Sequence, residues 1–143
     1  MTASTSTRSE QRTEFLTDVF VTAMEGGVSF WARVLEYRHS DTPRAVLVRT
    51  EDLALDDDSL QWLPVEGAER LTVDLDVIAR GLNRITAAAA EEIRYLPERY
   101  RLLVSAANRE NDMMPADGRH SDIDASIADS IVQVALFGEV VYG

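Results

Sequence analysis

Apolar side chains in residues 9–27 recur every three or four positions, which is the spacing of one face of an α-helix. Ser9 is a favoured N-cap residue, and the pair Gly26 and Gly27 favours a helix end. The pattern predicts an N-terminal helix of about four turns. Its apolar face consists of Phe15, Leu16, Val19, Phe20, Ala23 and Met24.

The composition becomes strand-like after the two glycines. Residues 28–37 are rich in β-branched and aromatic side chains, and residues 45–49 read Ala-Val-Leu-Val-Arg. Residues 38–43 between them are typical of a turn. We therefore expect an antiparallel β-hairpin, with a third short strand near Trp62 or at residues 70–73.

Two further helices are expected in the middle of the chain. The first begins after Thr72 or Asp74 and runs toward the alanine tract at residues 87–90. The second covers residues 98–109, because Pro97 suits the first turn of a helix.

The last helix has a wide apolar face, and we expect it to lie at the centre of the core. It begins near Ser121 or Asp122, where Ser121 and Asp124 approximate a capping box. Gly138 permits a break, and residues 139–142 are expected to form either a short strand or a fraying turn. The side chains expected on its polar, outward side are Asp122, Ser126, Asp129, Ser130 and Gln133.

These elements predict a single α+β domain over residues 9–143. It comprises an N-terminal helix, an antiparallel β-hairpin of two to three strands, and three further helices, the C-terminal one central to the core. Residues 1–8 are small and polar, and we expect them to form a disordered tail. A chain of 143 residues is long enough to bury a core without a disulfide.

The chain carries 25 acidic and 14 basic residues, a formal net charge of −11. Such a surface repels nucleic-acid phosphates and attracts a basic protein partner, so we expect the second and no direct nucleic-acid binding. Solubility alone is the alternative explanation. Residues 51–58 are expected to form a solvated loop, whose candidate interaction residues are Glu51, Asp52, Asp56, Asp57 and Asp58.

The residue types that the chain lacks exclude several kinds of catalytic and metal-binding site. The chain has no cysteine, which excludes disulfides, thiolate nucleophiles and cysteine-ligated metals. All its basic residues are arginine, so a lysine Schiff base and a phosphate-loop lysine are excluded as well. No apolar run is long enough to cross a bilayer and the N-terminus lacks a secretory signal, so we expect a cytoplasmic protein without a membrane partner. No cofactor is expected.

Two segments resemble a known group of proteins. They are Thr22–Trp31, which contains Glu-Gly-Gly-Val-Ser-Phe-Trp, and Asp122–Gly143, which contains Ala-Leu-Phe-Gly-Glu. This combination resembles a group of small, uncharacterised proteins of bacteriophages and actinobacterial genomes. The group has no assigned activity. The resemblance therefore implies no catalytic residue, but it implies a phage or mobile-element context and favours an interaction or anti-defence role.

The Gly26-Gly27 turn is a candidate ligand site. Together with Phe30 and Trp31 it could form a backbone nest beside an aromatic platform, which suits a nucleotide or another anionic planar ligand. Trp31 and Arg33 would complete a stacking pocket if they shared an exposed strand face. The simpler alternative is that the glycines end a helix and Trp31 packs in the core.

The acidic stretch at residues 110–124 is a candidate metal site, with Asp117, His120, Asp122 and Asp124 as ligands. The calcium-loop pattern does not fit, because Met and Pro stand where acidic ligands belong. The helix dipole alone also accounts for Asp122 and Asp124 near a helix N-terminus.

No catalytic residue is assigned, because the nucleophile-elbow pattern Gly-x-Ser-x-Gly does not occur and no carboxylate pair is distinguished by its spacing. Residues 140–142 could add as a strand to a second copy, which makes a homodimer one expectation, or pair within their own chain. Our leading hypothesis is a non-enzymatic, phage or mobile-element binding protein that engages a basic host-protein surface, as an inhibitor or anti-defence factor. The alternatives are a small-ligand or nucleotide binding or sequestering protein, and a metal-dependent hydrolase using residues 110–124.

Overall fold

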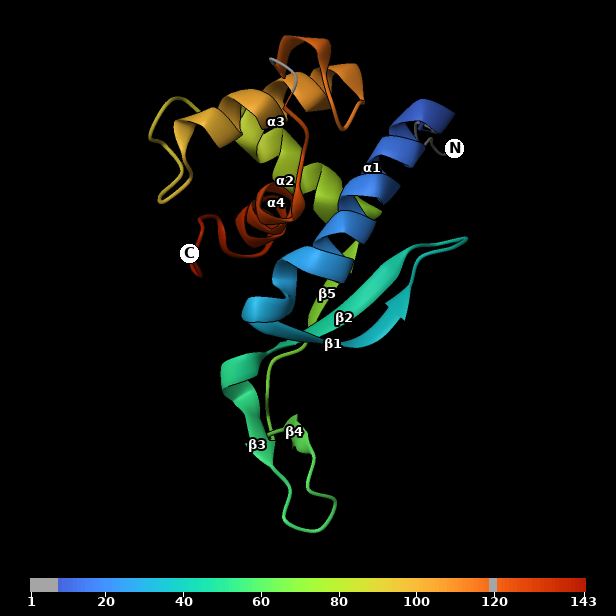
Figure 1. Cartoon of the computed structure of the whole chain (residues 1–143), viewed down its shortest axis with the longest axis vertical. Helices are drawn as coiled ribbons and strands as arrows, with labels where there is room; N and C mark the ends of the chain where they lie inside the picture. The colour runs from blue at the N-terminus through green and yellow to red at the C-terminus, as the bar shows by residue number, and fades with distance from the viewer. Residues whose placement is uncertain (1–7, 119–120) are drawn as a thin grey trace, which may run out of the picture.

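The computed structural model describes residues 8–118 and 121–143, and within them the chain has an α+β fold. Four α-helices surround one face and one end of a three-stranded antiparallel sheet, and a two-stranded sheet projects from the other end (Figure 1). The expected fold class is confirmed. The predicted tail at residues 1–8 lies outside the described residues except for Arg8, whose guanidinium pairs with Asp76 at 2.5 Å. The elements are α1 (Glu10–Thr22), β1 (Ala32–Arg38), β2 (Arg44–Arg49), β3 (Leu53–Leu55), β4 (Trp62–Pro64), β5 (Leu71–Asp74), α2 (Leu75–Ala87), α3 (Glu98–Glu110) and α4 (Ala125–Phe137).

The N-terminal helix α1 begins as the sequence predicts and ends differently. The Ser9 side chain accepts a hydrogen bond from the backbone N–H of Arg12 at 3.1 Å, which satisfies one of the free donors at the helix start. At its other end the helix widens into a π-helical turn, η1 (Ala23–Gly27), and then a 3₁₀ turn, η2 (Val28–Phe30). The glycines are therefore part of a wider turn and do not stop the helix.

The larger sheet has the strand order β1-β2-β5, with both pairs antiparallel. The predicted hairpin is present, but its first strand starts at Ala32, because residues 28–30 form η2 instead of extended chain. The register shifts between Val34 and Glu36, which marks a bulge in β1. The strand β5 corresponds to the third strand expected at residues 70–73.

The second sheet corrects one expectation. Residues 51–58 do not form a loop throughout, because Leu53–Leu55 are strand β3 and pair with β4 around Trp62. A 3₁₀ turn, η3 (Thr50–Asp52), leads from β2 into this hairpin. In Figure 1 the β3–β4 hairpin extends away from the helices at the lower end of the molecule.

The helices α2 and α3 follow the sequence pattern closely. The Asp74 carboxylate accepts a hydrogen bond from the N–H of Val77 at 2.9 Å and caps α2, so Asp74 and not Thr72 is the N-cap. Pro97 stands directly before α3, where its missing N–H costs no hydrogen bond.

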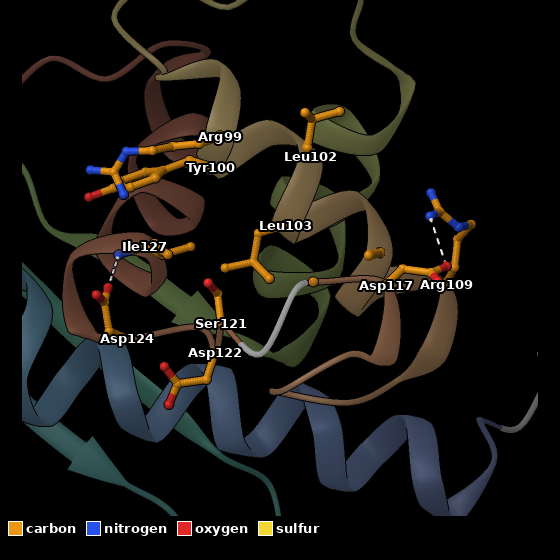
Figure 2. A pocket seen from close by; sticks show the side chains of 12 residues that line it. Arg99, Tyr100, Leu102, Leu103, Arg109, Asp117, Ser121, Asp122, Asp124 and Ile127 are labelled. Atoms are coloured by element: carbon orange, nitrogen blue, oxygen red, sulfur yellow. Dashed lines mark hydrogen bonds and ion pairs between the residues drawn. The ribbon is translucent and has the colours of Figure 1, made fainter.

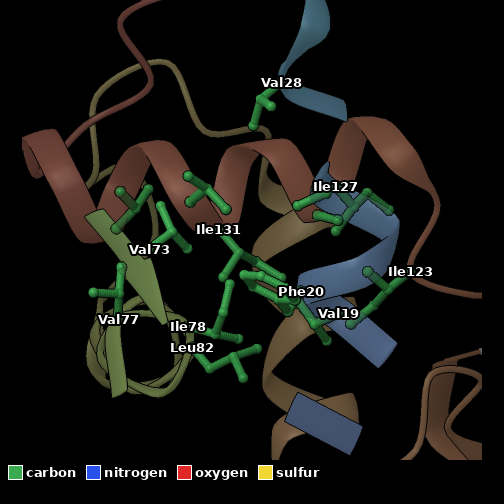
Figure 3. Packing of buried hydrophobic residues seen from close by; sticks show 14 of the residues in the cluster. Val19, Phe20, Val28, Val73, Val77, Ile78, Leu82, Ile123, Ile127 and Ile131 are labelled. Carbon is green, nitrogen blue, oxygen red and sulfur yellow. The ribbon is translucent and has the colours of Figure 1, made fainter. Parts of the chain in front are cut away.

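The C-terminal helix α4 packs against α2, against η1 and against α1, and so lies at the centre of the core. Figure 3 shows Ile127 and Ile131 of α4 beside Phe20 of α1 and Ile78 of α2, and all four side chains are buried. The expected helix start was three or four residues early, because Asp124 itself caps the helix through the N–H of Ile127.

Two expectations for this end of the chain are wrong. The side of α4 expected to face solvent is partly internal, because Asp129, Ser130 and Gln133 are buried. The alternative of a strand at residues 139–142 is also wrong, because Gly138 and Glu139 form a bend and residues 140–143 have no regular structure. No helix in the described part of the chain is long and apolar enough to span a membrane.

Candidate binding surfaces

Trp31 lies in the core with its indole ring almost completely buried, at 3% exposure. Its Nε1–H donates a hydrogen bond to Oδ1 of Asp129 at 2.7 Å. The ring of Tyr142 stacks on it in parallel, with centroids 5.0 Å apart, and Phe137 meets it edge-on at 5.6 Å. We call Trp31, Asp129, Gln133, Phe137 and Tyr142 the Trp31 cluster.

Gln133 fixes both the carboxylate and the end of the chain. Its Nε2 donates to Oδ2 of Asp129 at 2.7 Å and to the carbonyl oxygen of Tyr142 at 2.9 Å. Its Oε1 accepts from the N–H of Tyr142 at 2.8 Å. The amide orientation of Gln133 is therefore set by the backbone of Tyr142, and both oxygens of Asp129 have a neutral donor.

Asp129 is a buried carboxylate without a basic partner among the described residues. Burial raises its pKa from 3.8 to about 6, although the hydrogen bonds from Trp31 and Gln133 work in the opposite direction. Desolvation of the charged form thus outweighs the two neutral hydrogen bonds.

Of the two glycines, Gly27 is required for close packing beside this cluster. A Cβ atom on Gly27 would lie 2.6 Å from the carbonyl oxygen of Ala125, so only glycine lets η1 approach the first turn of α4. A Cβ on Gly26 would meet Ala125 at 3.4 Å, which is an ordinary contact. The two segments of the family resemblance, residues 22–31 and 122–143, therefore pack against each other here.

A hollow of about 320 Å³ opens beside the cluster, and we call it the α4 hollow. Gly26 and Gly27 line it, as the ligand hypothesis expected, whereas Trp31 does not. A second hollow of about 400 Å³ lies against Trp31, and Phe30 and Tyr142 border both. Other residues of the α4 hollow are Tyr95, Tyr100, Asp129 and Gly143.

Arg33 is not part of either hollow. Its Nη1 donates to the carbonyl oxygen of Trp62, which ties β1 to the β3–β4 hairpin. The structure therefore does not bring Trp31 and Arg33 together on an exposed strand face.

Three of the four candidate metal ligands, Asp117, Asp122 and Asp124, line a third hollow of about 720 Å³ between α3 and the start of α4 (Figure 2). Asp117 lies beside Arg109 on one side of it, 4.0 Å from the guanidinium, whereas Asp122 and Asp124 lie on the other side. Asp124 is engaged in capping α4. His120 lies outside the described residues, and those described contain no group of three potential ligands that could hold a metal.

The five acidic interaction candidates fall on the β3–β4 hairpin and its base. Glu51 and Asp52 belong to η3, and Glu51 accepts a hydrogen bond from the hydroxyl of Tyr142 at 3.0 Å. Asp57 and Asp58 are exposed at the tip. Asp56 accepts hydrogen bonds from Ser59, and these lower its pKa.

Sequence reasoning missed the exposed apolar side chains that accompany these acids. Trp62 is 57% exposed and Leu60 is 73% exposed, and three further apolar side chains of the hairpin are also exposed: Leu55, Leu63 and Val65. It also missed Asp129 and Gln133, which were placed on the solvent side of the last helix. Their spacing of four residues on the same helix, followed by an aromatic C-terminal segment, was the available signal.

Comparisons with known proteins give no further guide to this chain. No family model matches it, and neither a curated protein nor a solved structure shows significant similarity.

Proposed function

We propose that this chain is a non-enzymatic binding protein, of phage or mobile-element origin, that uses the β3–β4 hairpin to engage a basic surface of a host protein. The observation that carries the proposal is the exposure of apolar side chains on a projecting hairpin that also bears carboxylates. The resemblance to the phage and actinobacterial group supports the biological context. An inhibitor or anti-defence role is the form of activity that such a surface suits.

Both faces of the hairpin offer apolar contacts. Leu55 pairs with Trp62 across the strands, so these two side chains share one face. Leu63 lies on the opposite face and is exposed as well. A two-stranded hairpin that is uncovered on both faces is poorly stabilised by itself, and a partner that covered one face would bury a large aromatic side chain.

The backbone at the tip adds an independent argument. Leu60 has φ of 59°, a left-handed conformation that costs a leucine roughly 1–2 kcal/mol. The same side chain is the most exposed large apolar group of the hairpin. A residue that is unfavourable in both conformation and solvation is better explained by contact with a partner than by folding.

Charge selects the type of partner. Asp57 and Asp58 stand at the tip, and Glu51 and Asp52 stand at the base of the same hairpin. Two copies joined through this hairpin would bring these carboxylates together, which is unfavourable. A surface with arginine or lysine around an apolar depression is complementary to it, and long-range attraction would also accelerate association.

The test uses the full chain as bait in a lysate of an actinobacterial host, followed by binding measurements with the purified partner. We expect the unaltered chain to capture a basic partner. Trp62→Ala should weaken the affinity for this partner by at least about tenfold, because a central tryptophan is a typical hot spot. Affinity should also fall as salt rises, and a double variant Asp57→Asn/Asp58→Asn should reduce that salt dependence.

The matched control is Leu102→Ala, which removes another exposed apolar side chain on α3. It should bind the partner as the unaltered chain does. Equal loss of binding in Leu102→Ala and Trp62→Ala, or a partner whose binding ignores both Trp62 and salt, would contradict the proposal.

A further inference from the structure

The α4 hollow has the composition of a small ligand site and does not belong to the β3–β4 hairpin. Its volume of about 320 Å³ falls at the lower end of the range for small-molecule pockets. It is bordered by four separate parts of the chain: the segment from Gly26 to Phe30, the loop before α3 with the first turn of that helix, the helix α4 and the C-terminal segment. A hollow of this size accommodates one small organic group.

Helix α4 forms one wall of the hollow and contributes Asp129 to it, with a side chain that is 3% exposed. Only neutral groups, the Trp31 indole and the Gln133 amide, donate to this carboxylate among the described residues. Each carboxylate oxygen has a second lone pair, so both oxygens retain capacity for another donor. The raised pKa of Asp129 has burial as its largest cause, and this indicates a negative charge that the fold leaves under-compensated.

Four aromatic side chains also border the hollow. Phe30 and Tyr95 are 59% and 67% exposed, and Tyr100 and Tyr142 also border the hollow. Tyr95 has φ of 65°, so this large exposed ring is held in a left-handed conformation that glycine or asparagine would adopt more easily. Aromatic faces attract cations, and the ring of Tyr95 already carries the Arg94 guanidinium 4.9 Å from its centroid.

From this arrangement we infer that the α4 hollow binds a cationic nitrogen group, an ammonium or a guanidinium, with Asp129 as the ion-pair partner and Phe30 and Tyr95 as aromatic walls. The group belongs either to a free amine or to a lysine or arginine side chain of another protein, because both present the same chemistry. A nucleotide or another anion is disfavoured in this hollow, because the Asp129 carboxylate repels it.

Small probes test the inference directly. In the variant Trp62→Phe, Trp31 is the remaining tryptophan, and it reports on Asp129 through its hydrogen bond. We expect n-butylammonium and n-butylguanidinium to change its fluorescence saturably, whereas n-butanol and butyrate do not. Each substitution below is made in this background.

Three substitutions distinguish the site from a general salt effect. Tyr95→Ala should weaken binding of both cations by about two- to fivefold, the size of one cation–π contact. Asp129→Asn should abolish the binding of both cations, and circular dichroism checks that this variant is folded. If Asp129→Asn does not fold, the result for Tyr95→Ala decides the test. Leu102→Ala, which lies outside the α4 hollow, should bind like the parent.

A short blocked peptide with one central arginine, compared with its glycine counterpart, identifies the source of the cation. Binding of the small cations and the arginine peptide in competition indicates a site for any such group, and binding of the peptide alone indicates a protein side chain. No saturable binding by any cation, or equal binding by the parent and both site variants, would overturn the inference. These outcomes test the α4 hollow and leave the proposed function of the β3–β4 hairpin untouched, because Trp62 is replaced in every chain used here.

Discussion

The two tryptophans of this chain occupy opposite environments. Trp31 is 3% exposed, its ring is stacked on Tyr142, and its indole N–H is bonded to Asp129. Trp62 is 57% exposed on a hairpin whose faces contact solvent. Trp31 therefore stabilises the fold, whereas Trp62 is exposed at the surface. The environment of each side chain distinguishes these two roles.

The largest expected effect is on the free energy of unfolding when Trp31 is removed. Trp31→Ala leaves a cavity and one unpaired oxygen on Asp129, so we expect a loss of about 3–5 kcal/mol. Trp62→Ala removes an exposed side chain and should change stability by no more than about 0.5 kcal/mol. Urea unfolding of both variants measures the contrast, and similar losses in the two would show that the hairpin tryptophan is part of the core.

The next effect tests the contact between η1 and α4. Gly27→Ala places a Cβ within 2.6 Å of the Ala125 carbonyl oxygen, and the backbone must move, at a cost of about 1–3 kcal/mol. Gly26→Ala is the matched control, because its Cβ finds an ordinary 3.4 Å contact. Thermal unfolding should therefore show a much lower midpoint for Gly27→Ala than for Gly26→Ala, and equal midpoints would remove the close-packing explanation.

A third effect is the pH dependence that Asp129 gives to the Trp31 cluster. Its pKa in the folded protein, about 6, lies above the ordinary 3.8, so the folded state holds this proton more tightly than the unfolded state. The resulting stabilisation is complete below pH 3.8 and is lost as pH rises through about 6. After allowance for solvent screening at the hollow, we expect about 1–2 kcal/mol.

Other carboxyl groups also contribute to the pH dependence of stability, so the measurement is the difference between the parent and Asp129→Asn. Glu92 and Glu98, for example, have lowered pKa values and give the opposite slope. Urea unfolding from pH 4 to pH 7 should show the parent losing stability relative to Asp129→Asn. A constant difference across this window would mean that Asp129 titrates normally.

The sequence predicted the apolar framework well and the polar interior poorly. The helical spacing of Leu16, Val19 and Phe20 identified α1, the cap Ser9 was correct, and Asp74 was one of the two candidates for the cap of α2, because helices and caps depend on local pattern. The burial of Asp129 and Gln133 was missed, because a polar side chain on a helix suggests solvent until its partners are known. Those partners, Trp31 and the backbone of Tyr142, are distant in sequence or lie beyond the helix end.

The same limit applies to the candidate sites. The acidic run at residues 51–58 was visible in the sequence and predicted a solvated loop, but the exposed apolar side chains within and beside it were not predicted to be a binding surface. Their exposure arises because no other element of the described residues covers β3 and β4, which is a property of the whole fold. Likewise Gly26 and Gly27 suggested an anion-binding turn, and only the packing of α4 against them brings a carboxylate to the hollow instead.

The smallest expected effect is at Leu60, where one substitution should change stability and partner binding in opposite directions. Asparagine accepts a left-handed backbone more readily than leucine does, so Leu60→Asn should stabilise the fold, by about 0.5–1 kcal/mol. It also removes the most exposed apolar side chain of the hairpin, so binding of the basic partner should weaken at the same time. Urea unfolding and partner titration of the same preparation measure both quantities. A variant that gained stability and retained full affinity would show that the strained leucine serves neither folding nor the proposed contact, and it would leave Trp62 as the hairpin's principal contact.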